Sequence, residues 1–336
     1  MSAAGPDYLW GICCPARVVA AALPAIVDWC RSRRVERPML VGGRSLSAAP
    51  RGLALLHGLE AAGLAVWAFD RGASPSLAVV ADAVASYHFE GCDALVAVGG
   101  GTAAEVAKGA ALMVGQRSPY RALVPDPDDP PQPVDASAIP PLLAVPATAA
   151  GAAAASAALW IADDAGVARP FRHPALRPLE AVLADDLVAA VPLPAMLRSA
   201  AVLALLAADA GADDTEVEGL LAARQPGELM RSALRLAAVL EAAPAPARRL
   251  ALTAAGTAGV DFAGVLLALA RRADWRDAAG RRLEPIAAVV PDAAVIRAAR
   301  RACNPADAGP VDALLAAAGV ECGEQPRRRG RRGRVQ

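Results

Sequence analysis

The sequence predicts an α/β domain with a parallel sheet, followed by an all-helical domain. Strands that alternate with helices pair in parallel, because each crossover helix returns the chain to the same end of the sheet. From residue 192 onward the chain instead shows successive Ala- and Leu-rich helical patterns divided by Pro and Gly. In the first half, helical patterns separate short apolar runs at residues 38–42, 64–69, 94–98 and 142–145.

The helical segments place apolar residues three and four positions apart. The helices at residues 50–62 and 75–90 are expected to begin at Pro50 and Pro75, because proline is tolerated in a first helical turn. A third helix is expected at residues 102–114. In the second half, helices are expected at residues 193–208, 214–223, 228–242, 245–258, 263–272, 292–303 and 310–318.

The chain of 336 residues is long enough for two domains. The predicted division is an α/β domain at residues 1–165, for which the glycine turn described below indicates nucleotide binding, an all-helical domain at 166–325 and a disordered Arg-rich tail at 326–336. That tail is interpreted as a solubilising terminus, with a contact for an acidic partner as the alternative.

Composition excludes several classes of protein. The 34 basic and 34 acidic residues cancel, which argues against nucleic acid or an anionic membrane as a partner. Six cysteines without CxxC spacing are typical of a reduced, cytoplasmic setting. The first residues lack a basic region followed by an apolar run, so no signal peptide is expected. No membrane span is expected either.

A glycine-rich turn follows the strand at residues 94–98. Gly99, Gly100 and Gly101 end that strand, and a helix is expected to begin with Thr102 near its N-cap. Glycines tolerate positive φ and let backbone N–H groups approach a ligand closely. A helix N-terminus adds unpaired N–H donors and the positive end of the helix dipole, which suits a pyrophosphate. The turn therefore predicts a phosphate site, with a plain tight turn as the alternative.

Two scarce residue types are found in the same half of the chain. Of the 34 basic residues one is lysine, Lys108, and it lies in the helix after the glycine turn. A chain that otherwise uses arginine indicates a need for a compact ammonium there, although a single residue can also be an accident. Threonine is scarce as well, yet Thr102 and Thr148 both lie at strand ends, where ligands of open α/β sheets bind.

These segments resemble the iron-containing alcohol dehydrogenase superfamily, which includes glycerol dehydrogenase and dehydroquinate synthase-like proteins. GGGTAAEVAK is similar to the pattern GGGSxxDxAK, with Thr102 for Ser and Glu105 for Asp. PLLAVPATAAGAAAAS is similar to the stretch PTTAGTGSE, in which Pro146 and Thr148 are kept. The resemblance covers residues 11–208, and it implies a Rossmann-like domain followed by a helical one.

The resemblance also implies NAD as the cofactor. Members place an acidic or small residue near the adenosine ribose, and Asp70 falls there. A carboxylate accepts a hydrogen bond from the ribose 2′-OH and repels a 2′-phosphate, so Asp70 favours NAD over NADP. The expected cofactor-binding residues are Asp70, Gly99, Gly100, Gly101, Thr102, Glu105, Lys108, Pro146 and Thr148.

A metal is implied by the resemblance as well, but the matching residues are missing. Members hold Fe²⁺ or Zn²⁺ with one Asp and three His of the helical domain, and the first two positions fall at Val202 and Leu206 here. The chain has no histidine after residue 173. Because a divalent site needs about three or four converging ligands, no metal is expected. An acidic cluster is interpreted as a solvated helix start, with a carboxylate metal site as the alternative: Asp209, Asp213, Asp214, Glu216 and Glu218.

No catalytic residue is assigned. His88 is expected to have a structural role at a helix end. His173 is expected to be a surface residue, with an acid or base beside a cleft as the alternative. No pattern places a nucleophile near either histidine or near His57.

Two functions remain open. The first is a degenerate family member that binds NAD(P), has lost the metal site, and serves as an accessory subunit for a catalytic enzyme or a peptide substrate in a biosynthetic pathway. The second is a metal-independent NAD(P)-dependent oxidoreductase. A third reading makes the glycine turn a relic that binds neither cofactor. By resemblance, a homodimer is expected.

Overall fold

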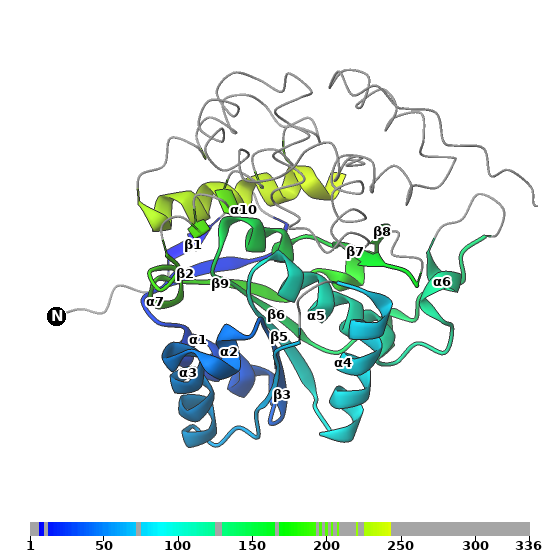
Figure 1. The fold of residues 1–336 in the computed structure, drawn as a ribbon, viewed down its shortest axis with the longest axis horizontal. Helices are drawn as coiled ribbons and strands as arrows, with labels where there is room; N and C mark the ends of the chain where they lie inside the picture. Colours follow the sequence, from blue (N-terminus) through cyan, green and yellow to red (C-terminus); the bar gives the residue numbers. More distant parts are fainter. Residues whose placement is uncertain are drawn as a thin grey trace, which may run out of the picture.

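Figure 1 shows the fold of the chain in the computed structural model. An open sheet lies at its centre, and α10 (Pro226–Ala242) lies across one end of the sheet. The predicted α/β class is confirmed. Residues 168–192 of the predicted helical domain are described, and they include strands at residues 168–172 and 180–184, so this part of the domain is not all-helical. Apart from these residues, α10 and the isolated residues named below, the predicted helical domain and the Arg-rich tail lie outside the described residues. The structure describes residues 7–9, 13–71, 75–124, 130–164, 168–192 and 225–242, with residues 195–196, 199–200, 203, 207 and 220.

The main sheet of the described residues has seven strands in the order β1-β2-β9-β6-β5-β3-β4. All neighbours pair in parallel except β1 and β2, which pair antiparallel at one edge. Strands β7 and β8 form a separate antiparallel pair. The bounds are β1 Asp7–Leu9, β2 Ala16–Val19, β3 Pro38–Val41, β4 Trp67–Phe69, β5 Ala94–Gly99, β6 Leu142–Pro146, β7 Ala158–Ala162, β8 Ala168–Arg172 and β9 Glu180–Ala184.

Alternating residues of the central strands pack against helices on opposite faces of the sheet. Leu40 and Val96 join the core formed with α1 (Ala22–Arg33) and α3 (Pro50–Ala61). Met39 and Leu95, their chain neighbours, join the core formed with α4 (Leu77–Phe89) and α5 (Gly101–Met113). Strands covered on both faces are continuously apolar, which is why these runs were visible in the sequence. The short helices are α2 Ser45–Ala48, α6 Tyr120–Leu123, α7 Asp185–Val188, η1 Ala136–Ala138, η2 Ala149–Ala155 and η3 Pro174–Leu176.

The chain reverses its direction across the sheet between β3 and β5. Helix α3 carries the chain outward from β3 to β4, and α4 returns it past β3 to β5. The two crossovers lie on opposite faces, as right-handed connections require. The carboxyl ends of β3 and β5 therefore flank the switch point of the sheet, where ligands of open α/β proteins bind.

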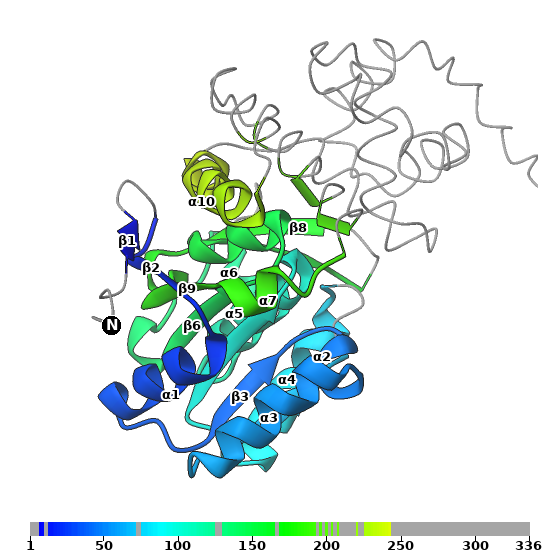
Figure 2. The ribbon, with the colours of Figure 1, turned by 90° about the vertical axis from the view of Figure 1, so that its left-hand side faces the viewer.

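The carboxyl edge is covered by α10. This helix packs against η2, which follows β6, and against α7, which follows β9. Figure 2 shows α10 above the ends of these strands from a second direction. None of the described helices is both long and apolar enough to cross a membrane.

One predicted helix start is wrong by two residues. Helix α4 begins at Leu77, because the Ser76 hydroxyl caps it by accepting a hydrogen bond from the Val79 N–H at 3.4 Å, so Pro75 precedes the helix. Helix α5 begins at Gly101 with Gly100 as its N-cap, so Thr102 is its second residue and lies near the cap, as expected.

Strands β2 and β9 were not predicted. Each is short and carries a charged residue, Arg17 inside β2 and Glu180 as the first residue of β9. The two strands are neighbours in the sheet, and these side chains form an ion pair. The predicted strand at residues 64–69 is also shorter than expected. Only its last three residues, β4, pair with β3, while the Ala65 N–H donates to the Glu36 carbonyl in the connecting loop.

A buried thiol makes the fold sensitive to alkaline pH. Cys30 of α1 is fully buried, and burial raises the pKa of its thiol to about 11, with a further rise from Asp93 and an opposing effect of Arg33. The unfolded thiol titrates near pH 9, so its contribution to stability is complete below pH 9 and is lost as the pH rises through 11.

We therefore expect the free energy of unfolding to fall as the pH rises from 9 to 10.5. In Cys30→Ala this decrease should be smaller, by up to about 1.4 kcal/mol per pH unit. Urea denaturation at each pH measures the slope. If the free energy of unfolding falls equally with pH in both proteins, the pKa of the Cys30 thiol is not raised by folding.

Candidate functional site

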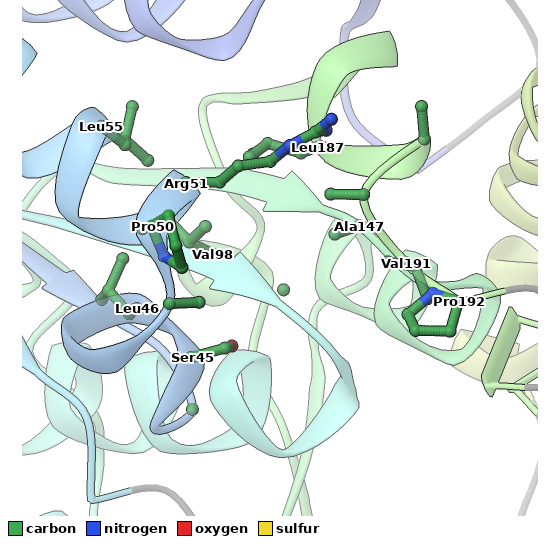
Figure 3. A pocket seen from close by; sticks show the side chains of 16 residues that line it. Ser45, Leu46, Pro50, Arg51, Leu55, Val98, Ala147, Leu187, Val191 and Pro192 are labelled. Atoms are coloured by element: carbon green, nitrogen blue, oxygen red, sulfur yellow. The ribbon is translucent and has the colours of Figure 1, made fainter.

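A cavity of about 660 Å³ lies at the carboxyl edge of the sheet, at the switch point between β3 and β5. Figure 3 shows its wall, with the start of α3 on one side and the segment after α7 on the other. Cavities of this volume that are mostly apolar are typical of small-molecule sites. Its lining residues are Gly43, Ser45, Leu46, Ala49, Pro50, Arg51, Gly52, Leu55, Val98, Gly99, Ala147, Leu187, Ala189, Ala190, Val191 and Pro192.

Gly99, the first residue of the glycine turn, forms the floor of this cavity. Gly99 has a φ of +115°, which side-chain-bearing residues rarely adopt. Helix α5 then begins at Gly101 without a side-chain cap on its first N–H groups. A Cβ added to Gly99 or to Gly43 would meet no atom within 4 Å, so bare backbone faces open space at both positions. This cradle of backbone fits an anionic ligand at a helix N-terminus.

One cationic side chain lines the cavity. The Arg51 guanidinium donates from Nη1 to the Asp186 carbonyl at 2.6 Å and so joins α3 to the start of α7. The Asp186 carboxylate accepts hydrogen bonds from the N–H groups of Ala22 (3.0 Å) and Leu187 (2.8 Å). With Arg51 and no acidic side chain among the lining residues of the described chain, the cavity favours a negatively charged ligand.

The structure brings several predicted residues together at the glycine turn. Pro146 pairs in register with Gly99, and the Ala147 N–H donates to the Gly99 carbonyl at 2.9 Å. Thr148 caps η2, because its Oγ1 accepts a hydrogen bond from the Gly151 N–H at 3.3 Å. A Cβ on Gly100 would lie 3.6 Å from that same Thr148 oxygen.

Glu105 and Lys108 lie below this turn and away from the cavity lining. Both are buried in α5, and their charged groups contact the segment that follows β6. Glu105 Oε2 accepts a hydrogen bond from the backbone N–H of Trp160 at 2.6 Å. Lys108 Nζ donates to the carbonyls of Ala153 and Ala158, each at 2.8 Å. In this structure both charges therefore bind protein atoms.

Asp70 follows β4 and also lies outside the cavity lining. Its carboxylate accepts a hydrogen bond from the Ser47 hydroxyl of α2. In contrast, Gly43 and Arg51 line the cavity and were not predicted. Gly43 had a signal, since Gly42 and Gly43 end a buried strand in the way that Gly99 to Gly101 do. Arg51 had none, because it is one of many arginines in the chain.

The histidines lie on three separate elements. His57 is exposed on α3, and His88 at the end of α4 contacts the Val114 carbonyl through Nε2 at 3.0 Å. His173 Nδ1 accepts a hydrogen bond from the Ala175 N–H at 3.2 Å and caps η3. Within the described ranges, no group of three or more His, Cys, Asp or Glu could hold a metal ion. These residues therefore do not fit a shared metal site. Val202, Leu206 and the acidic cluster from Asp209 to Glu218 lie outside the described residues.

A doubly wound sheet with a cavity at its switch point and a glycine turn at a helix N-terminus is typical of Rossmann-like α/β proteins. The chain belongs to the iron-containing alcohol dehydrogenase family, whose sequence profile matches residues 15–185, about half of its length. The resemblance noted in the sequence is confirmed at this level.

Individual relatives agree with the family. The 4-hydroxybutyrate dehydrogenase of Cupriavidus necator is 33% identical over 173 residues, which make up 51% of this chain and 44% of that protein. The match therefore spans less than half of that relative. An iron-containing alcohol dehydrogenase of Thermotoga maritima superposes with a TM-score of 0.66 at 16% identity, over 94% of this chain and 100% of that one. For maleylacetate reductase from Agrobacterium tumefaciens the TM-score is 0.56 at 20% identity, over 96% and 93%. At these identities the superpositions show the fold alone.

Proposed function

We propose that this protein binds NAD(H) or NADP(H) in the cavity above Gly99 and acts as a nucleotide-binding accessory subunit without the family's histidine-held metal. The observation that carries the nucleotide is the cavity at the switch point, with bare backbone at Gly43 and Gly99 and the uncapped start of α5 beside it. Such a floor suits a pyrophosphate. Arg51 adds a positive charge at the wall.

The accessory role is supported by the residues that the chain lacks. When bound, a nicotinamide cofactor carries hydride, and in this family the metal implied by the resemblance stabilises the substrate oxygen. Metal-assisted stabilisation of that oxygen contributes several kcal/mol to catalysis, on the order of a thousandfold or more in rate. The sequence has no histidine after residue 173, so the helical region has no imidazole to hold such an ion.

A second candidate is a metal-independent dehydrogenase. It is favoured by the 33% identity to a 4-hydroxybutyrate dehydrogenase over the segment that carries the glycine turn. In this case the Arg51 guanidinium, which lines the cavity, would stabilise negative charge on the substrate oxygen. The first substrate to test is 4-hydroxybutyrate.

The experiment is a calorimetric titration of the purified full-length protein with NADH and with NADPH, with metal analysis of the same sample. We expect micromolar to millimolar binding at one site and less than stoichiometric iron or zinc. We expect NADH to bind more tightly than NADPH, because Asp70 follows β4 at the same edge of the sheet as the cavity and its carboxylate would repel a 2′-phosphate. No binding at millimolar cofactor would refute the nucleotide site. Stoichiometric metal, or steady turnover of 4-hydroxybutyrate, would refute the accessory role.

The proposal includes a protein partner and a homodimer in the cytoplasm. Size-exclusion chromatography with light scattering, run with and without NADH, measures the oligomeric state. A monomer under both conditions would contradict the homodimer. Mixing the protein with a candidate catalytic enzyme, then measuring that enzyme's rate with and without NADH, tests the accessory role directly.

A further inference from the structure

Helix α5 buries two opposite charges on one face. Glu105 is 4% exposed and Lys108 is 1% exposed, and they lie three residues apart, so both project from the same side of the helix. Burying a charged side chain is costly unless hydrogen bonds satisfy it. The contacts that satisfy these two charges therefore indicate what they do.

The Lys108 ammonium donates to oxygen atoms in the segment after β6, three of which belong to two backbone carbonyls and one hydroxyl. These are the carbonyls of Ala153 and Ala158 at 2.8 Å each and the Ser156 hydroxyl at 3.4 Å. An ammonium has three N–H donors around a single nitrogen, whereas a guanidinium is a planar fork. This arrangement gives a physical reason for the one lysine among the 34 basic residues of the chain.

Glu105 fastens the next part of the same segment. Its Oε2 accepts the hydrogen bond from Trp160 in β7, at 2.6 Å. Together, Glu105 and Lys108 hold the stretch from Ala153 to Trp160 against α5. We call this pair the α5 clamp.

The other end of η2 touches the glycine turn. A Cβ on Gly151 would collide with the Gly99 carbonyl, and a Cβ on Gly101 would lie 3.4 Å from the Ala150 carbonyl. The Gly99 carbonyl is also bonded to the Ala147 N–H. A shift of η2 must therefore move the backbone that forms the cavity floor.

Helix α10 and Ser199 hold η2 from the opposite side. Helix α10 packs against η2, and the Ser199 hydroxyl accepts a hydrogen bond from the Ala150 N–H at 2.7 Å. The clamp adds charge-assisted hydrogen bonds to the direct packing of η2 on α5.

We infer that Glu105 and Lys108 are positioning residues, which set the affinity of the cavity for a dinucleotide by fixing η2 against the glycine turn without touching the nucleotide. This inference rests on the proposed function. It differs from the expectation that both residues bind the cofactor themselves, because their charged groups contact the protein segment below the floor.

The test compares clamp variants in the full-length protein. Lys108→Met keeps the length of the side chain and loses the donors, and we expect the Kd for NADH to rise about tenfold, the equivalent of one lost charge-assisted hydrogen bond. Lys108→Arg should weaken NADH binding as well, because the planar guanidinium does not match oxygen acceptors that surround a single nitrogen. Glu105→Ala should weaken binding similarly, whereas Glu105→Gln keeps an acceptor for the Trp160 N–H and should bind within about twofold of the unmodified protein.

A second readout follows the segment itself. Hydrogen exchange measured on peptides from residues 147–160 should accelerate at least about tenfold in Lys108→Met, while peptides from α1 stay unchanged. This readout needs no nucleotide. If the unmodified protein binds no NADH but exchange accelerates, the proposed function fails and the clamp stands. If exchange and affinity both stay unchanged, the inference is overturned.

A glycine variant tests the contact between η2 and Gly99 while Glu105 and Lys108 stay unchanged. Its result does not depend on whether a lysine variant folds. Gly151→Ala should push η2 away from Gly99 and raise the Kd for NADH with Lys108 intact. Gly227→Ala is the matched control, since a Cβ there meets only Asp185 Oδ1 at 4.0 Å, an ordinary contact. Equal affinities in these two variants would overturn the inference.

Discussion

Replacing Gly99 by alanine is expected to abolish measurable NADH binding while the protein still folds. A φ of +115° is strained for alanine and costs about 1–3 kcal/mol. Relief of that strain rotates the turn, which displaces the first N–H groups of α5, and the added methyl group projects into the cavity. We expect the Kd for NADH to rise more than about a hundredfold, because a pyrophosphate needs several of these donors at once.

Gly63 provides the matched control for this variant. It lies between α3 and β4 with a φ of +92°, and a Cβ there meets nothing within 4 Å. Gly63→Ala should therefore lose a similar amount of stability and keep its affinity for NADH. Calorimetric titration and urea denaturation of both variants separate the two effects. Normal binding by Gly99→Ala would contradict the assignment of the cavity floor.

Replacing Trp29 by alanine is expected to cost about 3–5 kcal/mol of stability, the range for deleting a buried aromatic side chain. Trp29 is 1% exposed in the core between α1, α3 and the sheet. Its indole N–H has no hydrogen-bond partner among the described residues. The Arg33 guanidinium stacks over its ring at 4.9 Å from the centroid. The contribution of Trp29 is therefore one of apolar area and packing.

The unpaired indole donor predicts a large difference between two substitutions. Trp29→Phe removes a buried donor that costs about 1–3 kcal/mol and keeps most of the ring, so we expect a loss below about 1.5 kcal/mol. Leu53→Ala on α3 is a control of similar chemistry, since Leu53 is 37% exposed and its loss should matter little. Guanidinium denaturation measures all three variants. Equal losses for Trp29→Ala and Trp29→Phe would mean that the indole N–H has a partner.

The sequence revealed the elements whose pattern is local. Strands β3, β5 and β6 are continuous apolar runs because helices cover both of their faces. Strands β2 and β9 were not visible, because each is a short run with a charged residue, Arg17 inside β2 and Glu180 at the start of β9, and these charges pair only when the two strands are adjacent. No local pattern can show a partner from the far end of the domain.

The candidate site also has residues that the sequence predicted and residues that it did not. The glycine turn was visible, since a phosphate cradle needs glycines at the junction of a strand and a helix. Arg51 was not, because its place depends on how α3 meets α7. Lys108 was recognised as exceptional, but a sequence cannot tell whether a buried ammonium faces a phosphate or the carbonyls of its own chain.

The place of β2 in the sheet determines the order in which the domain can be completed during synthesis. Apart from the short β1, β2 pairs only with β9, which the ribosome makes after all the other strands of this seven-stranded sheet. Until β9 emerges, the growing chain has a β6 edge without a neighbour and an N-terminal hairpin without a sheet to join. Such edges are sites of aggregation. We expect nascent chains that end before residue 180 to need chaperone protection, and longer ones to close the sheet in one late step.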